Sequence, residues 1–306
     1  MAEKNTKTEK NPFRDQEKMI IKISNLLTRA AHGLSLPEKR ILMIALGKID
    51  GEKVYNTNPV ARVHASEIAE IGGIDIKTAY LEARNGQQKL YERSISMLLD
   101  IKTGLPVPGG VRWVARAHYH KNEGWIEIAF NIDLVPYISK LKNEFTSYKL
   151  SRAGALRSIY SWRLFELLMQ FKTTGLLAIT VADFQDFIEA EPSHKKNFAN
   201  LRIRVIEPAI KEIGEKDGLN VTWKPITAGR KTTGLEFRFP RDPKTALPFV
   251  EPEKLASDLK SVELKVVKNK EDLSERQKIA EKQAEQRFAE LAAARGIEIP
   301  SKKVNM

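Results

Sequence analysis

Residues 195–213 combine hydrogen-bond donors with apolar side chains at helical spacing. Arginine can donate two hydrogen bonds to the edge of guanine, asparagine can pair with adenine, and a helix N-terminus favours phosphate. The expected inward positions are Phe198, Leu201, Val205, Ile206, Ile210 and Ile213. The expected outward donors are Lys195, Lys196, Asn200, Arg202 and Arg204. The pattern predicts a helix that presents its N-terminal half to nucleic acid, although an amphipathic helix with a solvated basic face would look the same.

Pro208 lies inside this helical segment. A proline in a helix interior lacks a backbone N–H and crowds the carbonyl four residues earlier. We therefore expect a kink or a break near Ile206 and Glu207.

A second group of donors lies in and beside the loop over residues 228–233, which joins two predicted strands over residues 219–227 and 234–241. Side chains on such a hairpin turn can contact a phosphate backbone, which positions a protein without specifying sequence. The expected contacts are Lys224, Arg230, Lys231 and Thr232. A basic helix followed by a basic hairpin favours DNA binding over a merely solvated helix.

His118 and His120 point to a different chemistry, because they alternate along a predicted strand and would share one face. With Tyr137 and Lys140 downstream, they match the pattern of rolling-circle nicking enzymes, in which a metal polarises phosphate for attack by tyrosine. No acidic third ligand is evident beside the pair, and polar side chains are expected at a hairpin tip. Nicking is therefore the less favoured hypothesis, and we predict neither a metal site nor catalytic residues.

Two further observations concern cofactors and the other histidines. The chain contains no G-x-x-x-x-G-K-[ST] phosphate loop, so we expect no nucleotide cofactor. His32, His64 and His194 are isolated in the sequence and are expected to be surface or packing residues.

The elements that must position these side chains begin in the N-terminal half. Ser35 and Glu38 form a capping box that starts an apolar helix. A short helix over residues 66–71, the pair Gly72-Gly73 and a second helix capped by Asp75 then describe a helix-turn-helix. In the second helix the inward residues are Ala79, Ala83 and Leu90. The side chains expected to face DNA are Lys77, Thr78, Arg84 and Gln88.

A predicted hairpin follows, and the outline then repeats. One strand places Val111, Trp113, Ala115, Ala117 and Tyr119 on one face, and the return strand does so with Ile126, Ile128 and Phe130. The pattern then repeats in the second half of the chain. It consists there of a helix over residues 159–171, a strand over 176–181, a helix capped near Asp183, the basic helix and the basic hairpin. A helix-turn-helix with a hairpin is the outline of a winged helix. The predicted fold class is α+β, with two winged-helix domains in tandem.

The positive charge lies in these predicted domains. The formal net charge is +12, from 51 Lys and Arg against 39 Asp and Glu. Residues 1–250 carry 39 basic and 28 acidic side chains, whereas residues 251–306 carry 12 and 11. Such an excess favours a polyanionic partner, because phosphate contacts release bound counterions.

Compartment and domain limits follow from composition. The chain has no cysteine, its N-terminus is polar and charged, and no apolar run reaches membrane-spanning length. We therefore expect a cytoplasmic protein without membrane association. The expected regions are a flexible basic arm over residues 1–18, an N-terminal winged helix over 19–150, a C-terminal winged helix over 151–242, and a charged, partly helical tail over 243–306.

Several motifs follow one another along the chain, namely LSLPEKRI at 34–41, FTSYKL at 145–150, SIYSWRLFELL at 158–168, the helix over 201–213, and GRKTTGLEFRF at 229–239. In their order and spacing these motifs resemble the iteron-binding replication initiators of theta-replicating plasmids, and the resemblance covers about residues 25–241. The resemblance implies a twin winged-helix protein encoded by a bacterial plasmid.

The resemblance also implies partners. Monomers would bind direct repeats in the plasmid origin, and dimers would bind an inverted repeat in the initiator's own promoter. The C-terminal winged helix would make the main base contacts, and the N-terminal domain would combine backbone contacts with dimerisation near Arg116. Host DnaA and the replicative helicase would be recruited to the opened origin. A dedicated winged-helix transcriptional repressor is the alternative hypothesis.

Overall fold

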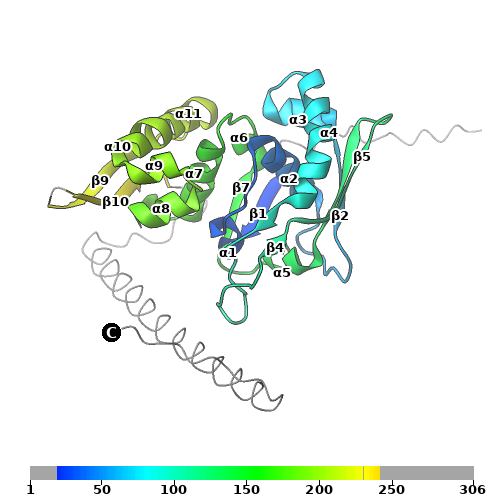
Figure 1. The fold of residues 1–306 in the computed structure, drawn as a ribbon, viewed down its shortest axis with the longest axis horizontal. Coiled ribbons are helices and arrows are strands. Elements are labelled where there is room, and N and C mark those ends of the chain that lie inside the picture. The colour runs from blue at the N-terminus through cyan, green and yellow to red at the C-terminus, as the bar shows by residue number, and fades with distance from the viewer. Residues whose placement is uncertain (1–18, 230, 242–306) are drawn as a thin grey trace, which may run out of the picture. The chain divides into compact units, whose positions relative to one another are not determined.

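The computed structural model describes residues 19–229 and 231–241. The predicted arm over residues 1–18, the predicted tail over residues 243–306, and Arg230 lie outside the described residues. The described chain folds into two successive winged helices of mixed helix and strand content (Figure 1). The predicted α+β fold class with tandem winged helices is confirmed.

The N-terminal winged helix is built on an antiparallel sheet with the strand order β2-β6-β5. Helices α3 and α4 form the predicted helix-turn-helix, and β5 and β6 form the hairpin after it. The bounds are β1 (Ile20–Ser24), α1 (Asn25–Arg29), α2 (Leu36–Lys48), β2 (Val60–His64), α3 (Ala65–Gly72), α4 (Ile76–Glu92), β3 (Ser94–Ile95), β4 (Val111–Arg112), β5 (Val114–His120), β6 (Trp125–Phe130), the 3-10 turn η2 (Ile132–Leu134), α5 (Val135–Ile138), β7 (Phe145–Lys149) and α6 (Leu150–Gly154).

The C-terminal winged helix is built on an antiparallel sheet with the strand order β8-β10-β9. Its helix α8 is capped by Thr180, whose hydroxyl accepts from the backbone N–H of Asp183, so the predicted cap near Asp183 is wrong by three residues. The bounds of the elements after α6 are α7 (Ile159–Gln170), β8 (Leu176–Thr180), α8 (Val181–Phe187), α9 (Pro192–Lys196), α10 (Phe198–Leu201), the π-helical turn η3 (Arg202–Ile206), α11 (Glu207–Asp217), β9 (Thr222–Ala228) and β10 (Lys231–Arg238).

Local signals set the helix ends in the N-terminal winged helix. At the start of α2, the backbone N–H of Ser35 donates to the carboxylate of Glu38 at 3.0 Å, which completes the predicted capping box. Asp75 caps α4 by accepting hydrogen bonds from two backbone N–H groups. Gly73 ends α3 with a φ of 57°, a left-handed conformation that glycine adopts without a Cβ clash. The predicted helix-turn-helix is therefore confirmed.

The β5–β6 hairpin departs from the predicted alternation at Ala115. The strand register shifts between Val114 and Arg116, which marks a β-bulge. As a result Trp113 and Val114 are both buried, while Ala115 is exposed. The predicted inward position of Ala115 is wrong, whereas the inward face of β6 is confirmed.

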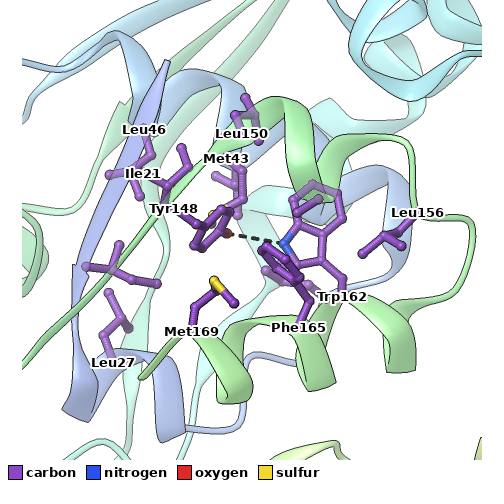
Figure 2. Close-up of a cluster of buried hydrophobic side chains, with 14 of the residues drawn as sticks. Ile21, Leu27, Met43, Leu46, Tyr148, Leu150, Leu156, Trp162, Phe165 and Met169 are labelled. Carbon is purple, nitrogen blue, oxygen red and sulfur yellow. Dashed lines mark hydrogen bonds between the residues drawn. The ribbon is translucent and has the colours of Figure 1, made fainter. Parts of the chain in front are cut away.

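Strand β1 pairs with β7, with Ile20 opposite Lys149, and these strands cover a core shared with α2 and α7. Figure 2 shows side chains of this core, namely Ile21, Leu27, Met43, Leu46, Tyr148, Leu150, Leu156, Trp162, Phe165 and Met169. Helix α7 packs against β7 on one side and against α11 of the C-terminal winged helix on another. One hydrophobic core is therefore continuous through both winged helices.

A buried arginine ties the two winged helices together. The guanidinium of Arg163, on α7, is 1% exposed and donates to the backbone carbonyls of Thr28 and Ala30 at 2.9 Å. Its Nε donates to the carbonyl of Phe187 at 2.8 Å. Glu189 lies 3.8 Å from the same guanidinium and has a φ of 54°, which is uncommon for a residue other than glycine. Burial lowers the pKa of Arg163, yet these acceptors satisfy its charged form.

His32 and Lys39 extend this cluster. The ring Nε2 of His32 lies 2.7 Å from the Leu27 carbonyl, which can only accept, so Nε2 carries the hydrogen. The other nitrogen, Nδ1, is therefore the acceptor, and its single lone pair is shared between Arg163 at 3.1 Å and Lys39 Nζ at 3.3 Å. Lys39 also forms a fully buried ion pair with Glu166 at 2.7 Å. Burial, Arg163 and Lys39 together lower the pKa of His32 well below 6.5.

None of the helices in the described residues is long and apolar enough to span a bilayer.

Breaking the buried Lys39–Glu166 pair should cost substantial stability. Lys39→Met leaves the Glu166 carboxylate buried without its counter-ion, so the free energy of unfolding should fall by about 3–5 kcal/mol. The measurement is urea unfolding at pH 7. Lys211→Met is the control, because Lys211 pairs with Glu215 at 3.8 Å in an exposed position and should change stability by less than about 1 kcal/mol.

A second variant separates loss of charge from loss of packing. The double variant Lys39→Met/Glu166→Leu removes both charges and should recover most of the lost stability. Equal stability losses for Lys39→Met and Lys211→Met would contradict the structural role given to the pair.

His32 should make the protein acid-sensitive. Because the pKa of His32 is lowered in the folded state, the unfolded chain binds an extra proton below about pH 6.5, and stability is lost as the pH falls. The difference in unfolding free energy between pH 7.5 and 5.5 should be about 1.4 kcal/mol smaller in His32→Gln than in wild type. His118→Gln, at an exposed position, serves as the control. An unchanged difference in His32→Gln would refute the assignment.

Candidate nucleic-acid interface

The basic helix of the C-terminal winged helix starts later than predicted. The expected continuous helix from Lys195 is wrong, because α9 ends at Lys196 and Asn197 has extended backbone. The Asn197 side chain accepts from the backbone N–H of Ala199 and so caps a new helix. Lys195 and Lys196 therefore lie on a separate short helix before the one that carries Asn200, Arg202 and Arg204.

Pro208 changes this new helix without breaking it. The chain forms the π-helical turn Arg202–Ile206 directly before Glu207 and Pro208. The missing N–H of proline and its crowding of the preceding turn provide the physical reason for the irregularity. The predicted kink or break near Ile206 and Glu207 is thus present as a π-helical turn, and α10, η3 and α11 follow one another directly.

The helix divides its side chains as predicted. Leu201, Val205, Ile206 and Ile213 are buried, and Phe198 and Ile210 are half-buried. Ala209 is also buried, which the predicted pattern omitted. The predicted donors Lys195, Lys196, Asn200, Arg202 and Arg204 are all exposed.

Neighbouring elements hold this helix in place. The ring of Phe198 lies 6.5 Å from that of Trp223 on β9, which joins the start of the helix to the hairpin. At the other end Arg152 forms two hydrogen bonds of 2.7 Å with the Asp217 carboxylate. Figure 1 shows α10 beside the hairpin of β9 and β10. Both ends of the helix are thus fixed before any ligand binds.

The basic donors differ in whether an acid already neutralises them. Lys195 pairs with Asp186 at 2.6 Å, Arg202 lies 3.5 Å from Glu207, and Lys224 lies 3.2 Å from Glu236. In the part of the chain that the structure describes, Lys196, Arg204 and Lys231 have no such ion pair. These three cations are therefore the ones most available to an external anion.

The hairpin turn is shorter than predicted. Strand β9 reaches Ala228 and β10 begins at Lys231, which lies opposite Ala228, so the predicted loop over residues 228–233 is wrong. Gly229 takes a φ of 61°, and Arg230 lies outside the described residues. Lys231 is exposed at the tip, whereas Thr232 is half-buried. The structure therefore places one predicted cation, Lys231, at the end of a two-stranded wing.

In the N-terminal winged helix, α4 holds the predicted outward residues. Ala79, Ala83 and Leu90 are fully buried. Lys77, Thr78, Arg84 and Gln88 are all exposed on α4. The hydroxyl of Thr78 donates to the Asp75 carboxylate, so the helix cap already uses it. Gln88 Nε2 donates to the Glu92 carboxylate at 3.4 Å, so Lys77 and Arg84 are the two cations among the four predicted residues.

Comparison with known proteins identifies the family. A family model described as "Initiator Replication protein, WH1" matches residues 20–169, and one described as "Initiator Rep protein, WH2" matches residues 180–239. An uncharacterised 27.6 kDa protein of Escherichia coli is 32% identical over 224 residues, which make up 70% of this chain and 92% of that protein. The chain belongs to this family of replication initiators.

Two further comparisons give proteins similar to this initiator, one in sequence and one in structure. The PI protein of Escherichia coli is 26% identical over 256 residues, covering 73% of this chain and 83% of that protein. The crystal structure of the Pi initiator protein in complex with iteron DNA has a TM-score of 0.64 at 24% identity, covering 74% of this chain and 99% of that one. The predicted domain boundary between residues 150 and 151 stays a prediction, since the first family match includes α7.

The histidine pair of the initiator lies on the outer hairpin. The rings of His118 and His120 are 4.6 Å apart, which confirms that they share one face, and His120 stacks on Trp125 at 3.6 Å. Contrary to expectation, an acid does lie nearby, because Glu127 on β6 is opposite His118. Arg116 holds this carboxylate at 2.6 Å. In the described residues, no three His, Asp or Glu side chains form a group that fits a metal ion.

Tyr137, the nucleophile of the nicking hypothesis, is not presented to this surface. It is 4% exposed, and its hydroxyl donates to the Leu99 carbonyl at 3.0 Å. The geometry therefore gives nicking no support.

Sequence reasoning missed one exposed apolar residue of the basic helix. Ile203 lies between Arg202 and Arg204 and is 52% exposed. The sequence offered one signal for this exposure, namely that the helical spacing of the inward residues leaves Ile203 out.

Proposed function

We propose that this initiator starts plasmid replication by binding direct repeats in the origin. The observation that carries the proposal is the helix from α10 to α11. Its inner face is buried in the core, and its outer face presents exposed Asn200 and Arg204 beside a basic wing. The Pi initiator, which has the same fold, was crystallised with iteron DNA, and this supports the proposal.

The two basic elements take different roles in this proposal. Arg202, Arg204 and Asn200 lie on a helix of the width that a major groove accepts, where arginine and asparagine distinguish bases. Lys231 at the wing tip, with Lys224 on β9, would contact phosphates and set the register. Lys195, Lys196, Arg230 and Thr232 would add backbone contacts around them.

The N-terminal winged helix would make a second DNA contact through Lys77, Thr78, Arg84 and Gln88 on α4. Its β5–β6 hairpin, with Arg116 63% exposed on the outside of the sheet, would form the dimer contact. In the dimeric form the initiator would bind an inverted repeat and repress its own promoter. Host DnaA and the replicative helicase would join it at the origin, in the bacterial cytoplasm.

No catalytic step belongs to the proposal. Strand opening would draw on binding energy and DNA deformation, since flexible A·T-rich steps are the easiest to distort.

Footprinting on the plasmid DNA beside the gene tests the function. Protection of several tandem repeats, spaced by about two helical turns, is expected from monomers that bind one face of the duplex. Protection confined to a single palindrome would instead favour the dedicated repressor. A covalent protein–DNA adduct that requires Mg²⁺ or Mn²⁺ would favour nicking.

The two roles of the basic residues are separable by substitution. Arg204→Ala should weaken repeat binding by about 1–3 kcal/mol and relax the preference at one base pair. Lys231→Ala should weaken binding about equally on all sequences. It should also make the negative slope of log K against log[salt] shallower by about 1, because one phosphate contact is lost. Both are measured by salt titration of affinity on repeat and scrambled DNA.

Lys211→Ala is the matched control, because Lys211 is exposed on α11 but pairs with Glu215. Identical behaviour of Arg204→Ala and Lys231→Ala would overturn the distinction between base contact and phosphate contact.

A further inference from the structure

We propose that Ile203 determines sequence specificity by packing against the 5-methyl group of a thymine in the repeat. The inference rests on the proposed function, since it needs the helix from α10 to α11 to lie in the major groove. The contact with Ile203 would be apolar, whereas the other proposed base and phosphate contacts of this helix and its wing are hydrogen bonds or ion pairs.

The position of Ile203 is the first argument. Its side chain is 52% exposed, while Leu201 and Val205, two residues away on either side, are buried. Arg202 and Arg204 on both sides of it are exposed as well. Ile203 therefore lies at the middle of the outward face, where the approach to a groove floor would be closest.

The π-helical turn is the second argument. A π-helix bonds residue i to i+5, so each turn holds more residues and successive side chains fan out over a narrower arc than in an α-helix. The turn Arg202–Ile206 thus lets three successive side chains share the outward face. A duplex that contacts both flanking arginines would therefore also contact Ile203.

The chemistry of isoleucine is the third argument. In the major groove thymine alone among the four bases presents a methyl group, and apolar side chains recognise it by contact. A β-branched side chain is stiff at χ1, so it loses little freedom when the contact forms. Lysine or arginine at the same position would lose more.

The test removes the methyl group alone. Affinity is measured for repeat DNA in which each thymine in turn is replaced by deoxyuridine, which lacks only the 5-methyl group. For the wild-type full chain, replacement of one particular thymine should lower the affinity about threefold to tenfold, as expected for loss of one buried methyl contact. For Ile203→Ala, that position should no longer distinguish thymine from deoxyuridine.

Two further variants serve as controls. Ile203→Val keeps a β-branched side chain and should retain sensitivity to deoxyuridine at the same position. Ile20→Ala removes an equally exposed isoleucine, 59% exposed on β1, and should behave as wild type.

The outcomes distinguish the inference from the function beneath it. Repeat-specific binding that no deoxyuridine position weakens, or sensitivity that Ile203→Ala fully retains, overturns the role of Ile203 and leaves the proposed function standing. Absence of any preference for repeats over scrambled DNA overturns both.

Discussion

A guanidinium group removed from water must find its acceptors inside the protein, and Arg163 finds them on both winged helices. Its partners are carbonyl groups at Thr28 and Ala30 in the N-terminal winged helix and at Phe187 in the C-terminal one. Breaking such contacts leaves a buried charge unsatisfied, which costs more than the contacts contribute when made. The cluster therefore fixes the positions of three chain segments relative to α7.

Helix α7, once fixed in this way, determines where the basic helix lies. Because α7 packs against β7 and α11, the core beneath the basic helix is the same core that holds β1 and α2. Glu189 strengthens the link, since its carboxylate accepts from the backbone N–H groups of His32 and Gly33 at 2.9 and 2.8 Å. The outward donors gain their fixed direction from this packing and not from contacts of their own.

The sequence predicted correctly those features that depend on residues close together in the chain. The Ser35 and Glu38 capping box, the Asp75 cap and the inward stripe of the basic helix depend on neighbours a few residues away, and each is present. The pairing of β1 with β7 joins Ile20 to Lys149, and no local pattern could reveal it. Burial of Lys39, Arg163 and Glu166 was equally hidden, because charged residues are normally exposed and only tertiary partners make their burial tolerable.

The candidate interface shows the same limit. Residue types predicted which side chains face outward on α4 and on the helix over residues 198–217. The break at Asn197 does have a local signal, because its side chain caps the new helix by accepting from the backbone N–H of Ala199. The contact of Phe198 with Trp223 instead joins segments that are distant in sequence. The bulge that exposes Ala115 depends on the register with β6. Spacing along one segment carries no information on strand register or on contacts between distant segments.

The separation of inner and outer faces on the basic helix has an evolutionary consequence. Leu201, Val205, Ala209 and Ile213 meet the demands of folding, while Asn200, Arg202, Ile203 and Arg204 contribute almost nothing to the core. Substitutions among the outer four would therefore be nearly neutral for folding. A plasmid lineage could drift to a new origin sequence through such changes while every intermediate initiator still folds.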